Sequence, residues 1–193
     1  MDIILFKDEK LGEEYLQAIF KEGIEFKDGS IIQTKKMDGK WANFSICKNP
    51  TRDQIGKSVD LVYSFEAEGR SDFMHHRNSG INQVLCKILK EKNIMIGFDY
   101  SMVLKNPSKA HIYIGRMRLN VKLCRKYGVG MVCLSFATKE NEIKDSNILD
   151  SFARMIGMNE EEIKISKKLI SKKIEFNILK KNGLISDGIR VVE

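Results

Sequence analysis

Several features are scarce in this 193-residue sequence, and each scarcity excludes a class of protein. Two prolines and 14 scattered glycines leave no proline-, glycine- or serine-rich linker, so we predict one continuous domain over residues 1–193. No apolar run approaches the roughly 20 residues that cross a bilayer. The first residues place an acid before a short apolar run, which is not the pattern of a secretory signal. We therefore expect a cytoplasmic protein that does not enter a membrane.

The spacings that usually hold metals are also missing. The cysteines include no C-x-x-C pair, and each lies in an apolar strand or helix pattern, so we expect buried free thiols. They are Cys47, Cys86, Cys124 and Cys133. The three histidines, His75, His76 and His111, form no H-x-H, H-x-x-x-H or E-x-x-H motif. We predict no metal site and no cofactor.

One pair of carboxylates suited to acid–base chemistry follows an apolar run. Glu66 and Glu68 lie two residues apart beside Asp72, so on a strand they would share a face. Strand ends carry the active sites of α/β barrels. Nothing nearby resembles a nucleophile or an oxyanion site, and we predict no catalytic residue.

Hydrophobic periodicity predicts an α/β protein. The predicted strands are Asp2–Phe6, Ser30–Thr34, Trp41–Ile46, Val59–Phe65, Ile94–Phe98, Val129–Ser135 and Ile189–Val192. The predicted helices are Leu11–Glu22, Ile81–Lys92, Ser108–Tyr127, Ile148–Ile156 and Glu160–Lys181. Two of these helices lead directly into strands that are apolar throughout, which is typical of parallel strands covered on both faces. Periodicity leaves an open sheet and a barrel as alternatives.

The last long helix has clear end signals. Asn159, with Glu162 three residues later, is a good helix start. Asn182-Gly183 is a good helix stop.

The net charge of +7 is distributed unevenly along the chain. No acidic residue lies between Asp99 and Glu140, whereas eight basic residues do. On a helix, four of these share one face: Arg118, Lys122, Arg125 and Lys126. Like charges at this spacing repel each other, and a phosphate backbone would offset the repulsion. A solvated basic face, or an acidic protein partner, would explain the pattern equally well.

Aromatic residues make up 8% of the sequence and form no pair resembling a base-stacking platform. If RNA is the ligand, we expect phosphate and shape contacts to dominate and binding to depend strongly on salt.

The most distinctive stretch is R-N-S-G-I-N-Q-V-L, from Arg77 to Leu85. Asn78 or Ser79 can cap the helix that follows, and Gly80 allows a close backbone approach at its start. Arg77 would then lie just before a helix N-terminus, a place suited to binding phosphate. An ordinary capped helix start has the same spacing.

This stretch, continued by Glu91–Asp99 and Leu104, resembles the signature region of protein component 3 of archaeal ribonuclease P. Arg116–Gly128 is similar to that family's arginine-rich helix and its R-K-Y-G ending. Ser135-Phe136-Ala137 and Ile156-Gly157-Met158 are similar to its S-x-A and Leu/Ile-Gly-Met steps. The resemblance runs in order from about Val59 to Asn182.

The resemblance implies a TIM-like barrel of parallel strands and helices, short or irregular at this length and related to the polymerase-and-histidinol-phosphatase fold. It implies a non-catalytic subunit of an endoribonuclease that removes the 5′ leader of precursor tRNA, in which RNA is the catalyst. The implied partners are ribonuclease P RNA, protein component 2, the other ribonuclease P proteins and, indirectly, precursor tRNA.

With this family in view, the candidate RNA contacts are Arg77, Asn78, Ser79, Arg116, Arg118, Lys122 and Arg125. Arg116 falls on a different helical face from the others, where it could instead serve a protein partner or a carboxylate. Two alternatives stay open. One is a metal-dependent phosphoesterase on the same fold, using His75 or His76 with Asp99 and His111; the other is a scaffold that binds only protein.

Overall fold

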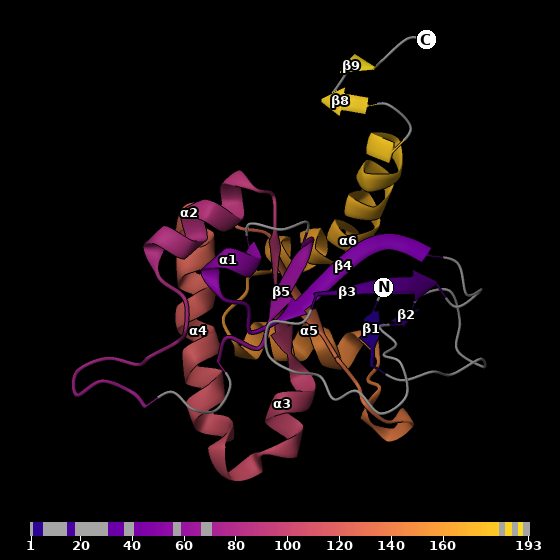
Figure 1. Cartoon of the computed structure of the whole chain (residues 1–193). Coiled ribbons are helices and arrows are strands. Elements are labelled where there is room, and N and C mark those ends of the chain that lie inside the picture. Colours follow the sequence, from indigo (N-terminus) through magenta and orange to yellow (C-terminus); the bar gives the residue numbers. More distant parts are fainter. Residues whose placement is uncertain are drawn as a thin grey trace.

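The computed structural model describes residues 2–5, 15–17, 31–36, 41–55, 59–66, 71–181, 184–186 and 189–190 (Figure 1). Within these ranges no helix combines the length and apolar character needed to span a bilayer. The strands are β1 (Asp2–Ile4), β2 (Tyr15–Gln17), β3 (Ile31–Lys36), β4 (Trp41–Lys48), β5 (Leu61–Tyr63), β6 (Met95–Asp99), β7 (Met131–Leu134), β8 (Leu184–Ser186) and β9 (Ile189–Arg190).

Most of the described helices lie in the second half of the chain. They are α1 (Arg52–Ile55), α2 (Gln83–Glu91), α3 (Tyr100–Lys105), α4 (Ala110–Tyr127), α5 (Ser146–Met155) and α6 (Glu160–Lys181), with the 3₁₀ turns η1 (Pro107–Lys109) and η2 (Glu140–Glu142). Four of the five predicted helices agree with this set to within two residues at each end, and α6 has the predicted bounds.

The α/β class is confirmed, and the sheet is mixed rather than wholly parallel. Its seven strands lie in sequence order, with β4, β5, β6 and β7 parallel to one another. Strand β3 runs antiparallel to both neighbours, while β1 and β2 are parallel. The helix predicted over Leu11–Glu22 is wrong at Tyr15–Gln17, and the rest of it lies outside the described residues. At Tyr15–Gln17, pairing with β1 and β3 buries Leu16 completely, and this pairing overrides the local helical pattern.

No continuous ladder joins β7 to β1 in the described part of the chain, so the model does not show a closed TIM barrel. The two edges meet at one point. A parallel bridge pairs Ile4 with Ala137, and the N–H of Leu5 donates to the carbonyl of Ala137 at 2.7 Å. Beside it, Oδ1 of Asp2 accepts the N–H of Ser135 at 2.8 Å.

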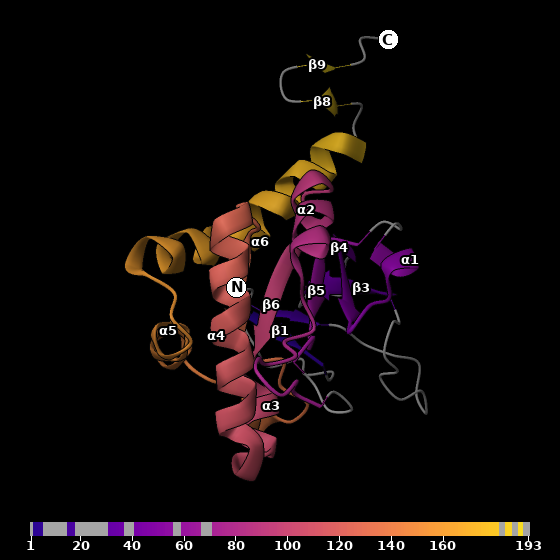
Figure 2. The ribbon, with the colours of Figure 1, turned by 90° about the vertical axis from the view of Figure 1, so that its left-hand side faces the viewer.

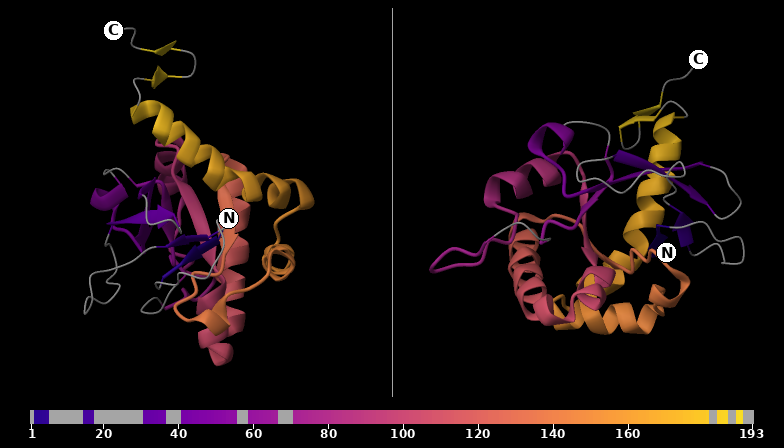
Figure 3. Two further views of the ribbon diagram at one scale, coloured as in Figure 1. Left: turned by 90° about the vertical axis from the view of Figure 1, so that its right-hand side faces the viewer. Right: turned by 60° about the horizontal axis from the view of Figure 1, so that its bottom comes forward.

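The sheet has a separate apolar core on each face. One face contributes Cys47, Val62 and Ile96 to a cluster with residues of α2, α4 and α5. Figure 2 shows α4 in front of the sheet, flanked by α5 and α2. The other face carries a second cluster that includes Leu61 and Val132. Helix α6 packs against both β4 and β7 and adds Ile170 and Ile174 to this cluster, and Figure 3 shows it crossing the strands obliquely.

The predicted start of α6 is confirmed as a reciprocal cap. Oδ1 of Asn159 accepts the N–H of Glu162 at 2.8 Å, and Oε2 of Glu162 accepts the N–H of Asn159 at 2.8 Å. The predicted stop at Asn182-Gly183 lies outside the described residues. The prediction of free thiols is also confirmed: Cys47, Cys86 and Cys124 are buried and Cys133 is partly buried.

Candidate nucleic-acid interface

Polar side chains gather where β5 and β6 end. Ser64 and Glu66 follow β5, and Asp99 is the last residue of β6. The hydroxyl of Ser64 donates to Oδ2 of Asp99 at 3.2 Å, and Oδ1 of Asp99 accepts the N–H of Met102 at 3.1 Å, which caps α3. Burial raises the pKa of Glu66 and of Asp99 to about 7 each, because neither carboxylate is well solvated. Glu68 lies outside the described residues.

Arg116 reaches these strand ends from α4. The arginine is buried; Nε and Nη2 donate to Oδ1 of Asp72 at 3.0 and 2.8 Å, and Nη1 donates to the carbonyl of Glu66 at 3.1 Å. Three hydrogen bonds therefore hold the guanidinium inside the chain. The sequence left a protein partner or a carboxylate as alternatives to RNA for Arg116, and in the structure it binds the carboxylate of Asp72.

Asn120, one turn further along α4, completes the same polar cluster. Its Nδ2 donates to Oε1 of Glu66 at 2.5 Å and to the carbonyl of Ser79 at 3.0 Å. Among the described residues, Oε2 of Glu66 and Oδ1 of Asn120 have no hydrogen-bond partner, although both atoms are buried. Asn120 was not among the predicted site residues. The available signal was a polar residue on an otherwise apolar face, four positions from Arg116.

The segment from Asp72 to Asn78 forms a closed loop. Oδ1 of Asp72 accepts the N–H of Asn78 at 3.0 Å, and the N–H of Phe73 donates to the carbonyl of His76 at 2.9 Å. The Phe73 and His76 rings stack, with centroids 4.6 Å apart and planes at 29°. Figure 1 shows this segment projecting from the body beside α4.

In the R-N-S-G stretch, one of the residues predicted to contact RNA is buried. Ser79 is 3% exposed, and its hydroxyl donates to the carbonyl of Ile81 at 3.4 Å. The prediction that Asn78 or Ser79 caps α2 is wrong, because Oδ1 of Asn82 accepts the N–H of Leu85 at 2.9 Å and occupies that position. The close approach at Gly80 is confirmed: its φ is +80°, and a Cβ there would lie 2.4 Å from the carbonyl oxygen of Phe65.

Arg77 is exposed and lies across α4. A Cβ on Gly115 would be 1.0 Å from Nη1 of Arg77, so the guanidinium occupies the space that the glycine leaves. At about 100° per residue, Gly115, Lys122 and Lys126 share one helical face. Arg77 is thereby placed in line with these two exposed lysines. We call Arg77, Lys122 and Lys126 the basic row.

The two arginines of the predicted stripe bind the end of α5 instead. Nε of Arg118 donates to the carbonyl of Met155 at 2.9 Å, and Nη2 of Arg125 donates to the carbonyl of Gly157 at 2.7 Å. Cations suit the partial negative charge at a helix C-terminus. Arg125 also pairs with Glu162 through 2.6 and 2.8 Å contacts, and this hydrogen bond lowers the pKa of Glu162. Glu162 of α6 therefore offsets part of the repulsion among the basic side chains of α4.

The residues named for a metal-dependent phosphoesterase do not come together. His75, His76 and His111 are exposed, whereas Asp99 is 8% exposed at the end of β6. Within the described ranges, no three histidine, cysteine or acidic side chains are placed to share a metal ion.

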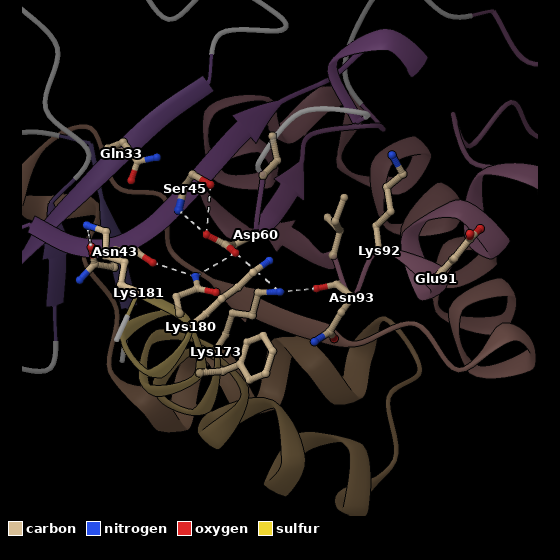
Figure 4. A pocket seen from close by; sticks show the side chains of 14 residues that line it. Gln33, Asn43, Ser45, Asp60, Glu91, Lys92, Asn93, Lys173, Lys180 and Lys181 are labelled. Atoms are coloured by element: carbon tan, nitrogen blue, oxygen red, sulfur yellow. Dashed lines mark hydrogen bonds and ion pairs between the residues drawn. The ribbon is translucent and has the colours of Figure 1, made fainter. Parts of the chain in front are cut away.

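A polar cavity of about 950 Å³ lies between β4, the end of α2 and α6 (Figure 4). Several of its polar side chains pair with one another. Nζ of Lys173 donates to the carbonyl of Asn93 at 2.8 Å and lies 3.6 Å from Asp60, and Nδ2 of Asn177 donates to Asp60 at 3.0 Å. These contacts join α6 to Asn93 and Asp60, so the polar side chains that make them have a structural role.

No family model matches the chain. Its sequence is similar to proteins named ribonuclease P protein component 3 from Methanosarcina mazei (30% identical over 133 residues) and Methanosarcina acetivorans (29% over 129 residues). Each match covers 64% of this chain and 54% of the relative, so the chain spans about half the length of the curated relatives it matches. The resemblance indicated by the sequence blocks is confirmed.

The fold is similar to a chain in a cryo-EM structure of archaeal ribonuclease P with mature tRNA. The TM-score is 0.56 at 20% identity, over 70% of this chain and 56% of that chain. The shared feature is the fold of the sheet and its helices.

Proposed function

We propose that this chain, a relative of ribonuclease P protein component 3, is a non-catalytic protein subunit of ribonuclease P, the ribonucleoprotein that removes the 5′ leader of precursor tRNA. The observation that carries the proposal is the sequence relationship over 64% of the chain to two proteins of that name. The fold shared with a chain of an archaeal ribonuclease P complex supports it independently of sequence identity.

We propose that the RNA subunit of that complex is the direct partner, that protein component 2 and the other protein subunits bind elsewhere on the chain, and that precursor tRNA is engaged indirectly. A cytoplasmic location suits this role. We also infer that the open sheet corresponds to an irregular TIM-like barrel, because its two edges meet at the Ile4–Ala137 bridge.

The basic row is the surface that we assign to phosphate. Gly115 and Lys126 are separated by eleven residues of α4, so the row extends over about 16 Å at 1.5 Å per residue. Phosphates of one strand recur about every 3.4 Å along a duplex axis, so the row is long enough to follow several successive phosphates. Asp72, an acid that interacts electrostatically with Arg77, is already paired with Arg116, and this leaves the row positively charged.

The other predicted contacts take supporting roles in this proposal. Ser79, Arg116 and Asn78 shape the loop that delivers Arg77 to α4, and Arg118 and Arg125 fix α4 against α5. RNA affinity should therefore depend on Arg77 and Lys122 directly and on the other residues through the fold.

An assembly experiment separates this proposal from a scaffold that binds only protein. The chain, component 2 and ribonuclease P RNA are mixed and passed over a size-exclusion column before and after nuclease treatment. We expect a large complex that contains the chain, and its collapse to smaller protein assemblies after digestion. A complex of unchanged size after complete digestion would favour the protein scaffold.

A further inference from the structure

The closed loop beside the basic row presents an aromatic surface to solvent. Phe73 is 57% exposed and Met74 is 92% exposed, although large apolar side chains are usually buried. The loop is nevertheless held in shape by the Phe73–His76 hydrogen bond and by the contacts of Asp72 with Asn78 and Arg116. An ordered loop that exposes apolar side chains indicates a surface made for contact.

The chemistry of the loop fits a nucleobase. Phe73 stacks on the imidazole of His76, so one aromatic face is supported from within the chain. An exposed face of such a pair can stack on any base, because every base has a π-face. Arg77 follows directly in the chain, and its guanidinium lies on α4 at Gly115, where it can neutralise the phosphate attached to a stacked base.

We propose that the Phe73–His76 pair is a preformed platform that stacks on one unpaired base of an RNA whose backbone follows the basic row. Bases are available for stacking only where a strand leaves the helix, at loops, bulges and ends. This inference rests on the proposed function for the identity of the RNA. It also adds a base contact to an interface in which the sequence predicted that phosphate and shape contacts would dominate.

A short RNA hairpin with a single bulged 2-aminopurine tests the platform, because the fluorescence of this base responds to stacking. The same hairpin without the bulge serves as the second probe. Phe73→Leu removes the aromatic face and keeps an apolar side chain, while Phe73→Trp keeps the face. Ile165→Ala is the matched control, because Ile165 is 58% exposed on α6, away from the loop.

We expect the wild-type chain to bind the bulged hairpin more tightly than the paired one and to change its fluorescence. Phe73→Leu should weaken binding to the bulged hairpin about 5- to 100-fold, the range of one base–aromatic stack, and abolish the fluorescence change. Phe73→Trp and Ile165→Ala should behave as wild type. The salt dependence of the remaining binding should be unchanged in Phe73→Leu, because no charge is lost.

Equal binding and fluorescence for wild type and Phe73→Leu would overturn the platform, as would wild-type binding that does not distinguish the hairpins. A Phe73→Leu variant that binds RNA normally but no longer binds component 2 would assign the loop to protein instead. The proposed function is judged separately, by whether the wild-type chain supports cleavage of precursor tRNA. Stimulated cleavage without a Phe73 effect refutes the platform alone; a Phe73-dependent fluorescence change without stimulated cleavage refutes the assignment to ribonuclease P alone.

Discussion

Arg116 of α4 and Asp72 of the projecting loop form an ion pair in which Nη2 lies 2.8 Å from Oδ1, with the arginine side chain 5% and the aspartate 34% exposed. The same guanidinium donates to the carbonyl of Glu66, so a single buried cation joins the end of β5, the loop and α4. Asp72 and Arg116 lie 44 positions apart in the sequence. The shape of the loop therefore depends on a helix that follows much later in the chain.

Replacing Arg116 by Met should destabilise the protein, because it keeps the apolar stem but removes the guanidinium that donates to the Glu66 carbonyl and to Asp72. We expect a loss of about 2–4 kcal/mol in the free energy of unfolding, measured by urea denaturation. Lys122→Ala, on the exposed face of the same helix, should change it by less than about 0.5 kcal/mol. Equal stability of the two variants would contradict the structural role of Arg116.

Glu66 should make stability depend on pH. Its pKa rises from 4.5 to about 7 on folding because burial disfavours the carboxylate, so the folded state retains a proton that the unfolded state releases. This stabilisation is complete below pH 4.5 and is lost as the pH rises through 7. Between these values the free energy of unfolding should fall with pH.

Glu66→Gln keeps a hydrogen-bonding side chain at this position and removes the titration. The variant should lose less stability between about pH 5 and pH 7 than wild type, by up to about 1.4 kcal/mol per pH unit. Asp99, whose pKa is also raised to about 7, will preserve part of the slope in both proteins. Parallel stability–pH curves would show that Glu66 does not carry the proton.

The roles assigned to Lys122 and Arg125 predict different salt dependences of RNA binding. Lys122→Ala should flatten the slope of log K against log salt by about 0.7–0.9, the value of one phosphate contact. Arg125→Ala should leave the slope nearly unchanged, because Glu162 already neutralises this charge. Filter binding across a salt series distinguishes them, and a larger slope change for Arg125 would restore it as a phosphate contact.

Gly97 should tolerate no larger side chain. Tyr63 and Phe136 stack at 4.0 Å in the core, and a Cβ on Gly97 would lie 3.0 Å from the Phe136 ring. Gly97→Val adds volume against this stack and should destabilise the protein by about 1–3 kcal/mol in thermal or urea unfolding. Unchanged stability would contradict the close packing of the Phe136 ring against Gly97.

Sequence periodicity predicted the helices and strands best where the apolar pattern was strong and the caps were explicit. Asn159 and Glu162 mark the start of α6 in the sequence and form a reciprocal cap in the structure. The strand at Tyr15–Gln17 could not be predicted this way, because its conformation depends on pairing with β1 and β3 on either side. A local pattern contains no information about such partners.

The same distinction applies to the candidate site: local features could be predicted, and contacts between elements could not. The exposed position of Lys122 followed from sequence and helical geometry. The inward turn of Arg116, the pairing of Arg125 with Glu162 and the stacking of Phe73 on His76 all depend on contacts between elements. The stack could not be predicted locally, because the loop that holds it is closed by contacts of Asp72 with Asn78 and with Arg116 of α4.

The most direct test of the account is cleavage of precursor tRNA by ribonuclease P RNA at modest magnesium. The reaction is run with RNA alone, with RNA and component 2, with RNA and both proteins, and with this chain alone. We predict that 5′-leader removal is stimulated only when the RNA and both proteins are present, and that the chain alone cleaves nothing. Cleavage by the chain alone that a chelator abolishes would contradict the account and reveal an active site in the protein itself.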